Sequence, residues 1–259
     1  MLSKALSKYI QSLHQKKFRQ EHAAFLVEGA KSVLELLHSD YQTELLLTTL
    51  PFRKENAPLL DKQRCRIEMV TSDDLERVGT LASNDACLAV VKTKDNRPID
   101  IEPDEWALVL DDVRDPGNLG TILRIADWYG IRKLICSNAT ADVYNPKVIS
   151  ASKGSFTRVS WYYCDLPEYL EQQKNMPVYG AFLDGETVYG ASFGASGLLV
   201  MGNESNGISP DVAPFITRKI TIPRFGGAES LNVGIATAVI LDNWRRRISD
   251  PAPNPLKGA

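Results

Sequence analysis

Apolar runs alternate with amphipathic stretches along most of the chain, and this alternation predicts an α/β protein. In the C-terminal half, short apolar runs predict buried strands near 106–110, 132–136, 158–162, 177–182, 197–201 and 218–222. Apolar residues at helical spacing predict helices at 118–129, about 145–152, 166–174 and 231–247. Strands that alternate with helices pair in parallel, so we expect a mostly parallel sheet here.

The N-terminal residues repeat the alternation on a smaller scale and predict a small α/β/α domain. Helices are expected from Leu2 to about Lys17, at 30–37, and from Ser72, which is the expected cap. Strands are expected at 24–27, 45–47, 66–70 and 86–91. A polar stretch with two prolines predicts a linker. The expected division is therefore a domain at 1–95, a linker at 96–104, a second domain at 105–248 and a disordered tail at 249–259.

The last expected helix is apolar on nearly all sides. Val233, Ile240 and Trp244 share one side, while Ile235 and Val239 make the other side apolar too. Such a helix must be buried, either in the core or against another subunit.

Composition narrows the class of protein but not its function. The 259 residues are 44% hydrophobic and 24% charged, as in a globular protein of one large domain or two ordinary ones. No apolar run approaches the roughly 20 residues that span a membrane, and the N-terminus lacks the apolar core of a secretory signal. The four cysteines are scattered without a C-x-x-C pair, so we expect reduced thiols in a cytoplasmic protein.

The net charge of −2 is uninformative, but its distribution is not. The first 20 residues contain no acid and carry five bases, which are Lys4, Lys8, Lys16, Lys17 and Arg19. This cluster suits a phosphate backbone, and the alternative is a solvated amphipathic helix.

Several common kinds of active site are excluded by the sequence. Residues 190–194 match the G-x-S-x-G nucleophile elbow, but no histidine follows His38 to serve as its base. The chain has neither a P-loop nor a G-x-G-x-x-G turn after a strand. Asp111, Asp112 and Asp115 could hold Mg²⁺, but no second carboxylate cluster follows them, so we expect a solvated acidic turn and no metal ion.

Three predicted strands each end in a polar loop with glycine. The first loop follows LVL at 108–110 and leads to Asn118, which could cap a helix from Leu119; Arg124 lies off the apolar face of that helix. The second is MGNESNGIS with Glu204, and the third is PRFGGAESLN with Ser230. Each alone could be an ordinary turn, but three in one domain favour a shared pocket at the carboxyl ends of the strands.

These three stretches resemble, in order, the motifs of the SpoU (TrmH-type) RNA 2'-O-ribose methyltransferases of the SPOUT class. The residues that carry the resemblance are DPGNLGTILRIAD, MGNESNGIS and ESLNV, within 106–247. KKFRQEHAAFLVEGAKSVLELL and CLAVV resemble, more weakly, the family's N-terminal substrate-binding domain, which is related to a ribosomal protein. Gly234 and Arg224 depart from the family, where Ser or Ala and Met are usual.

The resemblance implies a deep trefoil knot in the second domain, an exception to the usual rule against threaded chains. It also implies a homodimer packed through the terminal helix, and S-adenosyl-L-methionine bound among the loops. The cofactor-binding residues would be Leu199, Met201, Gly202, Asn203, Glu204, Gly207, Ile222, Pro223, Ser230, Leu231 and Asn232.

The resemblance assigns catalysis to Arg124, Asn118, Glu204, Ser230 and Asn232. Arg124 would help remove the proton of a ribose 2'-hydroxyl, which then attacks the methyl group. A free guanidinium, with a pKa above about 12, is a poor base, so a substrate phosphate or exclusion of water must assist it, or its role is to position the substrate.

The expected partner is structured RNA, ribosomal RNA before transfer RNA, and no membrane. Lys16, Lys17, Arg19 and Arg114 are the expected RNA contacts. The alternatives are the same chemistry on transfer RNA, or an RNA-binding assembly factor that has lost the chemistry.

Overall fold

In the computed structural model, which describes residues 2–248, the chain separates into two compact units. The first unit contains the residues up to 97 together with 114–127 and 141–160. The second contains residues 98–113, 128–140 and those from 161 onward. Two segments of the C-terminal half therefore group with the N-terminal residues, although the sequence places a linker between them. The tail at 249–259 lies outside the described residues.

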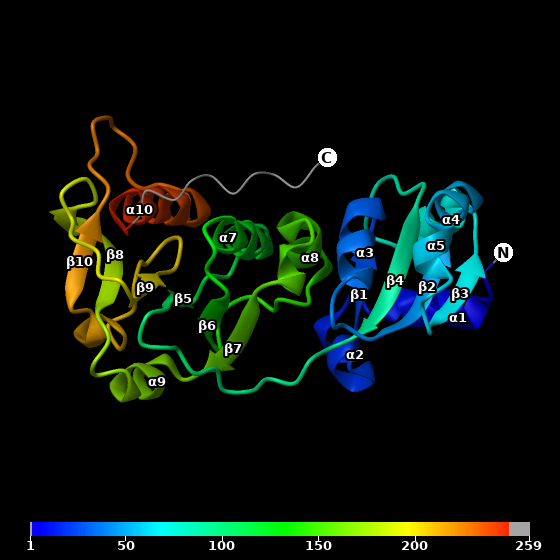
Figure 1. Cartoon of the computed structure of the whole chain (residues 1–259), viewed down its shortest axis with the longest axis horizontal. Helices are drawn as coiled ribbons and strands as arrows, with labels where there is room; N and C mark the ends of the chain where they lie inside the picture. The colour runs from blue at the N-terminus through cyan, green and yellow to red at the C-terminus, as the bar shows by residue number, and fades with distance from the viewer. Residues whose placement is uncertain (1, 249–259) are drawn as a thin grey trace. The chain divides into compact units, whose positions relative to one another are not determined.

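The first unit is built on a four-stranded sheet in the order β1-β4-β2-β3 (Figure 1). The strands are β1 (Ala24–Glu28), β2 (Thr43–Thr48), β3 (Arg66–Met69) and β4 (Cys87–Lys92). β4 runs antiparallel to β1 and β2, and β3 runs parallel to β2. The helices before β4 are α1 (Lys4–Ser12), α2 (Lys16–His22), α3 (Ala30–Leu37), α4 (Leu50–Glu55), α5 (Ala57–Leu60) and α6 (Ser72–Val78).

The single helix predicted from Leu2 to Lys17 is wrong, because the chain breaks between α1 and α2. At the break the Arg19 guanidinium donates hydrogen bonds to the carbonyl oxygens of Leu13 (3.1 Å) and His14 (2.9 Å). The prediction of Ser72 as a cap is also wrong. Thr71 caps α6, since its hydroxyl accepts a hydrogen bond from the Asp74 amide.

The six-stranded sheet has the order β10-β8-β9-β5-β6-β7, and pairs β10–β8, β8–β9, β9–β5 and β5–β6 are parallel. This confirms the expected mostly parallel sheet. Its strands are β5 (Trp106–Leu110), β6 (Lys133–Ser137), β7 (Ser160–Cys164), β8 (Val178–Thr187), β9 (Gly197–Met201) and β10 (Arg218–Thr221). The remaining helices are α7 (Pro116–Trp128), α8 (Pro146–Ser152), α9 (Leu166–Gln172) and α10 (Val233–Ile248), with short 3-10 turns at 155–157 and 213–215.

The central strands β5 and β9 are buried along their whole length, which explains why their sequences are uninterrupted apolar runs. At the start of β5, the Trp106 ring stacks on Tyr179 at 5.0 Å and contacts Trp244 of α10 at 4.9 Å. These contacts fix α10 to the second unit. The trefoil knot implied by the resemblance stays a prediction.

None of the helices within residues 2–248 has the length and apolar character needed to cross a bilayer. Cys87 and Cys136 are buried, and all four cysteines are unpaired thiols.

Candidate functional site

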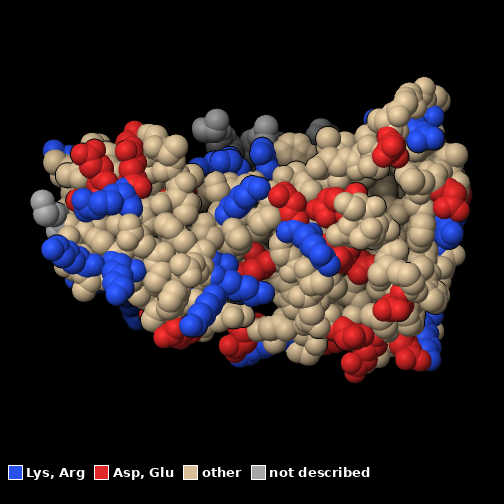
Figure 2. Space-filling view, turned by 180° about the vertical axis from the view of Figure 1, so that it is seen from behind, with Lys and Arg blue, Asp and Glu red and all other residues tan. Residues whose placement is uncertain are grey.

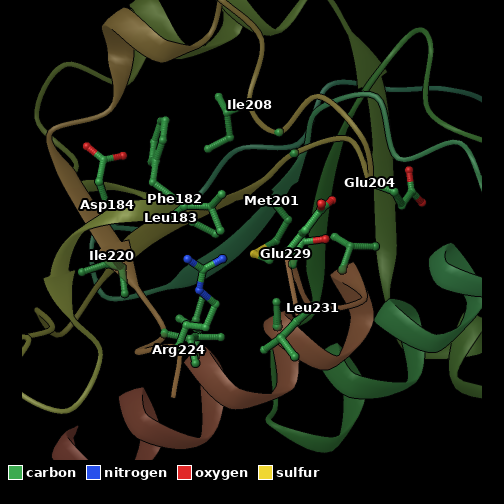
Figure 3. Close-up of a pocket in the computed structure, with 18 of the residues that line it drawn as sticks. Phe182, Leu183, Asp184, Met201, Glu204, Ile208, Ile220, Arg224, Glu229 and Leu231 are labelled. Atoms are coloured by element: carbon green, nitrogen blue, oxygen red, sulfur yellow. The ribbon is translucent and has the colours of Figure 1, made fainter. Parts of the chain in front are cut away.

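A cavity of about 710 Å³ opens in the second unit, where β9 and β10 end (Figure 3). It is lined by three chain segments, which are residues 181–184 of β8, the loop 201–208 and most of 220–233. Ala236 and Ile240 of α10 close it on another side. Two of these segments are the glycine-bearing loops that the sequence singled out.

The loop after β9 is shaped by a close crossing of its own backbone. A side chain at Gly202 would place its Cβ 2.2 Å from the carbonyl carbon of Gly207, so only glycine fits. Asn203 and Gly207 exchange two backbone hydrogen bonds of 2.9 Å. The Asn203 Oδ1 also accepts hydrogen bonds from the amides of Ser205 and Asn206. The loop is therefore a fixed cradle of backbone groups.

The end of β5 supports this loop through two acidic residues. Asn203 Nδ2 donates a 2.8 Å hydrogen bond to the carbonyl oxygen of Asp112, and the Ser209 amide donates one of 2.7 Å to Asp111 Oδ2. Asp111 is buried, and the hydrogen bond to its carboxylate holds the loop against the end of β5. Among residues 2–248, no group of three or more His, Cys, Asp or Glu could hold a metal ion.

The third loop crosses the cavity and ends at α10. The Asn232 Oδ1 accepts hydrogen bonds from the amides of Gly234 (3.0 Å) and Ile235 (3.4 Å), so Asn232 caps α10. Arg224 donates to the Ala228 carbonyl (3.4 Å), and Figure 3 shows its guanidinium pointing toward Met201. Glu204 lies at the opposite edge of the cavity (Figure 3).

Most of the predicted cofactor residues line this cavity, and two do not. Leu199 is fully buried inside β9, and Asn232 lies just outside as the cap of α10. Those on the wall are Met201, Gly202, Asn203, Glu204, Gly207, Ile222, Pro223, Ser230 and Leu231.

The sequence missed the contribution of β8. The predicted strand stopped at 182, whereas β8 continues to Thr187 and supplies Phe182, Leu183 and Asp184 to the wall. The available signal was Gly185, at which a Cβ would lie 2.6 Å from the Lys219 carbonyl oxygen of β10. A glycine in an extended run often marks such a close backbone approach.

The first motif lies in the first unit, at the start of α7. The prediction that Asn118 caps this helix is wrong. Pro116 takes the first position and Asp115 is the cap, since its Oδ1 accepts a 2.8 Å hydrogen bond from the Asn118 amide. That hydrogen bond, together with the nearby Lys147 ammonium, lowers the pKa of Asp115.

Arg124 is exposed on α7, away from the buried face of the helix. Its guanidinium forms no hydrogen bond or ion pair with any residue between 2 and 248. That buried face consists of Leu119, Gly120, Ile122, Leu123 and Ala126. The charge of Arg124 is thus available to a ligand.

The predicted RNA contacts differ in their exposure. Lys16, Lys17 and Arg114 are exposed, but Arg19 is only 3% exposed and its guanidinium binds Asp142 at 2.6 Å. The expectation that Arg19 contacts RNA is therefore corrected to a structural role. Figure 2 shows several Lys and Arg side chains, with a few acidic ones beside them, on the left of the view, where the four-stranded sheet lies.

Arg19→Ala should destabilise the fold, because it leaves Asp142 and two carbonyls without their partner. Breaking a buried ion pair costs about 3–5 kcal/mol, and urea unfolding will measure this. The double variant Lys16→Ala, Lys17→Ala is the control, since both side chains are exposed. It should keep the wild-type free energy of unfolding and reduce the salt dependence of RNA binding. A stable Arg19→Ala protein with weakened RNA binding would restore the original expectation.

Two family models match the chain. Residues 105–242 match the model described as the SpoU rRNA Methylase family, and residues 6–89 match the MRM3-like substrate binding domain. RlmP of Bacillus subtilis, a 23S rRNA (guanosine(2553)-2'-O)-methyltransferase, is 30% identical over 240 residues, which cover 90% of this chain and 93% of RlmP.

Two solved structures share the fold over nearly the whole chain. A Porphyromonas gingivalis protein assigned to the TrmH family of RNA methyltransferases is 38% identical, with a TM-score of 0.84, over 95% of this chain and 99% of that one. The SpoU methyltransferase AviRb of Streptomyces viridochromogenes, crystallised with AdoMet, is 27% identical, with a TM-score of 0.85 and coverage of 95% and 99%.

Proposed function

Because this chain belongs to the SpoU rRNA methylase family, we propose that it transfers a methyl group from S-adenosyl-L-methionine to a ribose 2'-hydroxyl of ribosomal RNA. The observation that carries the proposal is the cavity walled by the second and third family motifs, in a fold whose relative AviRb binds AdoMet. Ribosomal RNA is favoured over transfer RNA because RlmP acts on 23S rRNA and matches both halves of the chain. The proposal includes a cytoplasmic location.

The residues present fit this cofactor. The crossing at Gly202 folds the loop 201–208 tightly along the cavity wall, so the backbone of this loop would lie beside a bound adenine. Met201, Ile222 and Leu231 supply apolar wall, and the carboxylates of Glu204 and Glu229 suit a positively charged sulfonium. When bound, the cofactor supplies an activated methyl group.

The polar groups of the protein itself would bind and orient the substrate. Arg124 would hold the 2'-hydroxyl and a neighbouring phosphate with its planar fork, so that the hydroxyl meets the methyl group in line. Any guanidinium is a poor base, so a substrate phosphate near it is the better acceptor for the hydroxyl proton. Glu204 and Ser230 would shape the pocket, and Asn232 fixes the loop that carries Ser230. Asn118, on the same helix as Arg124, would help Arg124 to position the substrate.

Two measurements test the proposal. A calorimetric titration should give binding of S-adenosyl-L-methionine at about one per subunit and a raised melting temperature. Tritium from labelled cofactor should then pass to ribosomal RNA in a mixture of total RNA. Transfer to transfer RNA alone would favour the other substrate, whereas RNA binding without transfer would favour an assembly factor.

We also propose a two-fold dimer packed through α10. One side of this helix is buried, but Ile235 is 56% exposed and Ala238 and Val239 are only partly covered. An exposed apolar stripe on a core helix suits a self-complementary interface. Ile235→Glu should convert a dimer into monomers in sedimentation, while Leu50→Glu, at another exposed apolar residue, should stay dimeric. A monomeric wild-type protein at micromolar concentration would contradict the proposal.

A further inference from the structure

Helix α7, which carries Arg124, belongs to the compact unit of the N-terminal domain. It packs tightly on α8, because a Cβ at Gly120 would lie 2.6 Å from both the Ala151 Cβ and the Val148 carbonyl oxygen. Figure 1 shows these two helices side by side. α8 in turn packs against β1 of the four-stranded sheet. The chain of contacts therefore runs from β1 through α8 to α7.

An aromatic cluster forms the apolar part of this connection. The centroid of the Phe25 ring of β1 lies 4.6 Å from the ring centroid of Tyr144, which precedes α8. It lies 6.0 Å from the ring centroid of Phe156, which follows α8. Tyr41 contacts both Phe25 and Phe156 at 5.7 Å. The Tyr144 hydroxyl accepts a 2.7 Å hydrogen bond from the Lys94 amide, and burial raises the pKa of Tyr144 to about 12, so the phenol stays neutral. Four packed aromatic rings whose tyrosine hydroxyls are hydrogen-bonded make a rigid connection between β1 and α8.

Arg158 adds a polar clamp that reaches α7 directly. Its Nη1 donates to Glu35 Oε2 of α3 at 2.5 Å, while its Nε and Nη2 donate to Asp127 of α7 at 3.0 and 2.8 Å. Asp127 lies one helical turn beyond Arg124. A single guanidinium thus joins a helix of the N-terminal domain to the helix of the proposed catalytic arginine.

We propose that Arg158 is a positioning residue that couples RNA bound by the N-terminal domain to Arg124. The clamp and the aromatic cluster make α7 part of the first compact unit, which contains the N-terminal domain. RNA bound to that domain is therefore held at a fixed position relative to the Arg124 guanidinium. This inference rests on the proposed function, and it assigns the placement of the nucleophile relative to Arg124 to Arg158, which lies outside the three motifs.

The competing role for Arg158 is a direct contact with an RNA phosphate, since its side chain is 44% exposed. The two roles differ in what a lysine can replace. Lysine keeps the charge that a phosphate needs, but its donors share one nitrogen, so it cannot span Glu35 and Asp127 as the three nitrogens of the guanidinium do.

The test compares Arg158→Ala, Arg158→Lys and a matched control, Arg53→Ala. Arg53 forms an ion pair with Asp61 at 2.5 Å inside the N-terminal domain and does not reach α7. Single-turnover methylation is measured at saturating RNA and cofactor, with the two dissociation constants determined separately. Amide hydrogen exchange over residues 116–128 is followed in the same proteins, which reports the ordering of α7 without any catalysis.

Both Arg158 variants should methylate about tenfold more slowly, because small misplacements of a positioned group are costly. Their affinities for RNA and cofactor should stay within twofold of wild type, and the amides of α7 should exchange faster. Arg53→Ala should change neither the rate nor the exchange. A wild-type rate and exchange in Arg158→Ala, or a defect confined to RNA affinity and rescued by lysine, would overturn the proposal. A wild-type protein that methylates no RNA would instead refute the proposed function, and exchange would still show whether the clamp orders α7.

Discussion

Arg124→Ala is expected to lower single-turnover methylation by about 10²-fold or more, because a misplaced nucleophile costs a rate factor of that scale. Arg124 is exposed and its guanidinium has no partner among residues 2–248, so its loss should cost little folding stability. Arg124→Lys should rescue little, because an ammonium lacks the planar fork that holds two oxygens at once. Cofactor affinity should survive both changes, since the cavity is lined by other segments.

Arg132→Ala provides the matched control, because Arg132 is also an exposed arginine but lies outside α7. It should methylate at the wild-type rate. If Arg124→Ala folds, binds cofactor and methylates as fast as this control, Arg124 has no part in the reaction.

Gly202→Ala should abolish measurable cofactor binding and lower the melting temperature. The added Cβ would lie 2.2 Å from the Gly207 carbonyl carbon and 2.3 Å from the Ile208 amide nitrogen. Both are backbone atoms that are fixed by the Asn203–Gly207 hydrogen bonds, so the loop must open to admit a methyl group. Calorimetric titration with S-adenosyl-L-methionine and thermal unfolding measure the two effects.

Gly226→Ala is the control, since Gly226 also lines the cavity but nothing lies within 4 Å of its added Cβ. It should bind cofactor with nearly unchanged affinity. Equal affinities of the two alanine variants would show that the crossing at Gly202 does not shape the site.

The sequence predicted the strands of the large sheet well because buried parallel strands are uninterrupted apolar runs. β5 and β9 fall within the predicted ranges, and the polar loop that follows β9 forms part of the cavity wall. β8 was predicted too short because its second half is exposed and lacks an apolar pattern.

Features that depend on distant partners could not be read from local pattern. Arg19 looked like a surface base beside two lysines, but Asp142, more than 120 positions away, binds it in the interior. The link between Arg158 and Glu35 is equally remote in sequence. The grouping of α7 with the N-terminal domain depends on such contacts. The polar sequence of the predicted linker, which led us to separate the two halves of the chain, does not indicate them.

The most direct test of the account is the chemical position of the transferred methyl group. Ribosomal RNA is treated with the protein and S-adenosyl-L-methionine carrying a deuterated methyl group, then digested to nucleosides for mass spectrometry. We predict the label on the ribose 2'-oxygen of one kind of nucleoside, and no label with Arg124→Ala under single-turnover times. Label on a base, or no label on ribosomal RNA despite cofactor binding, would contradict it.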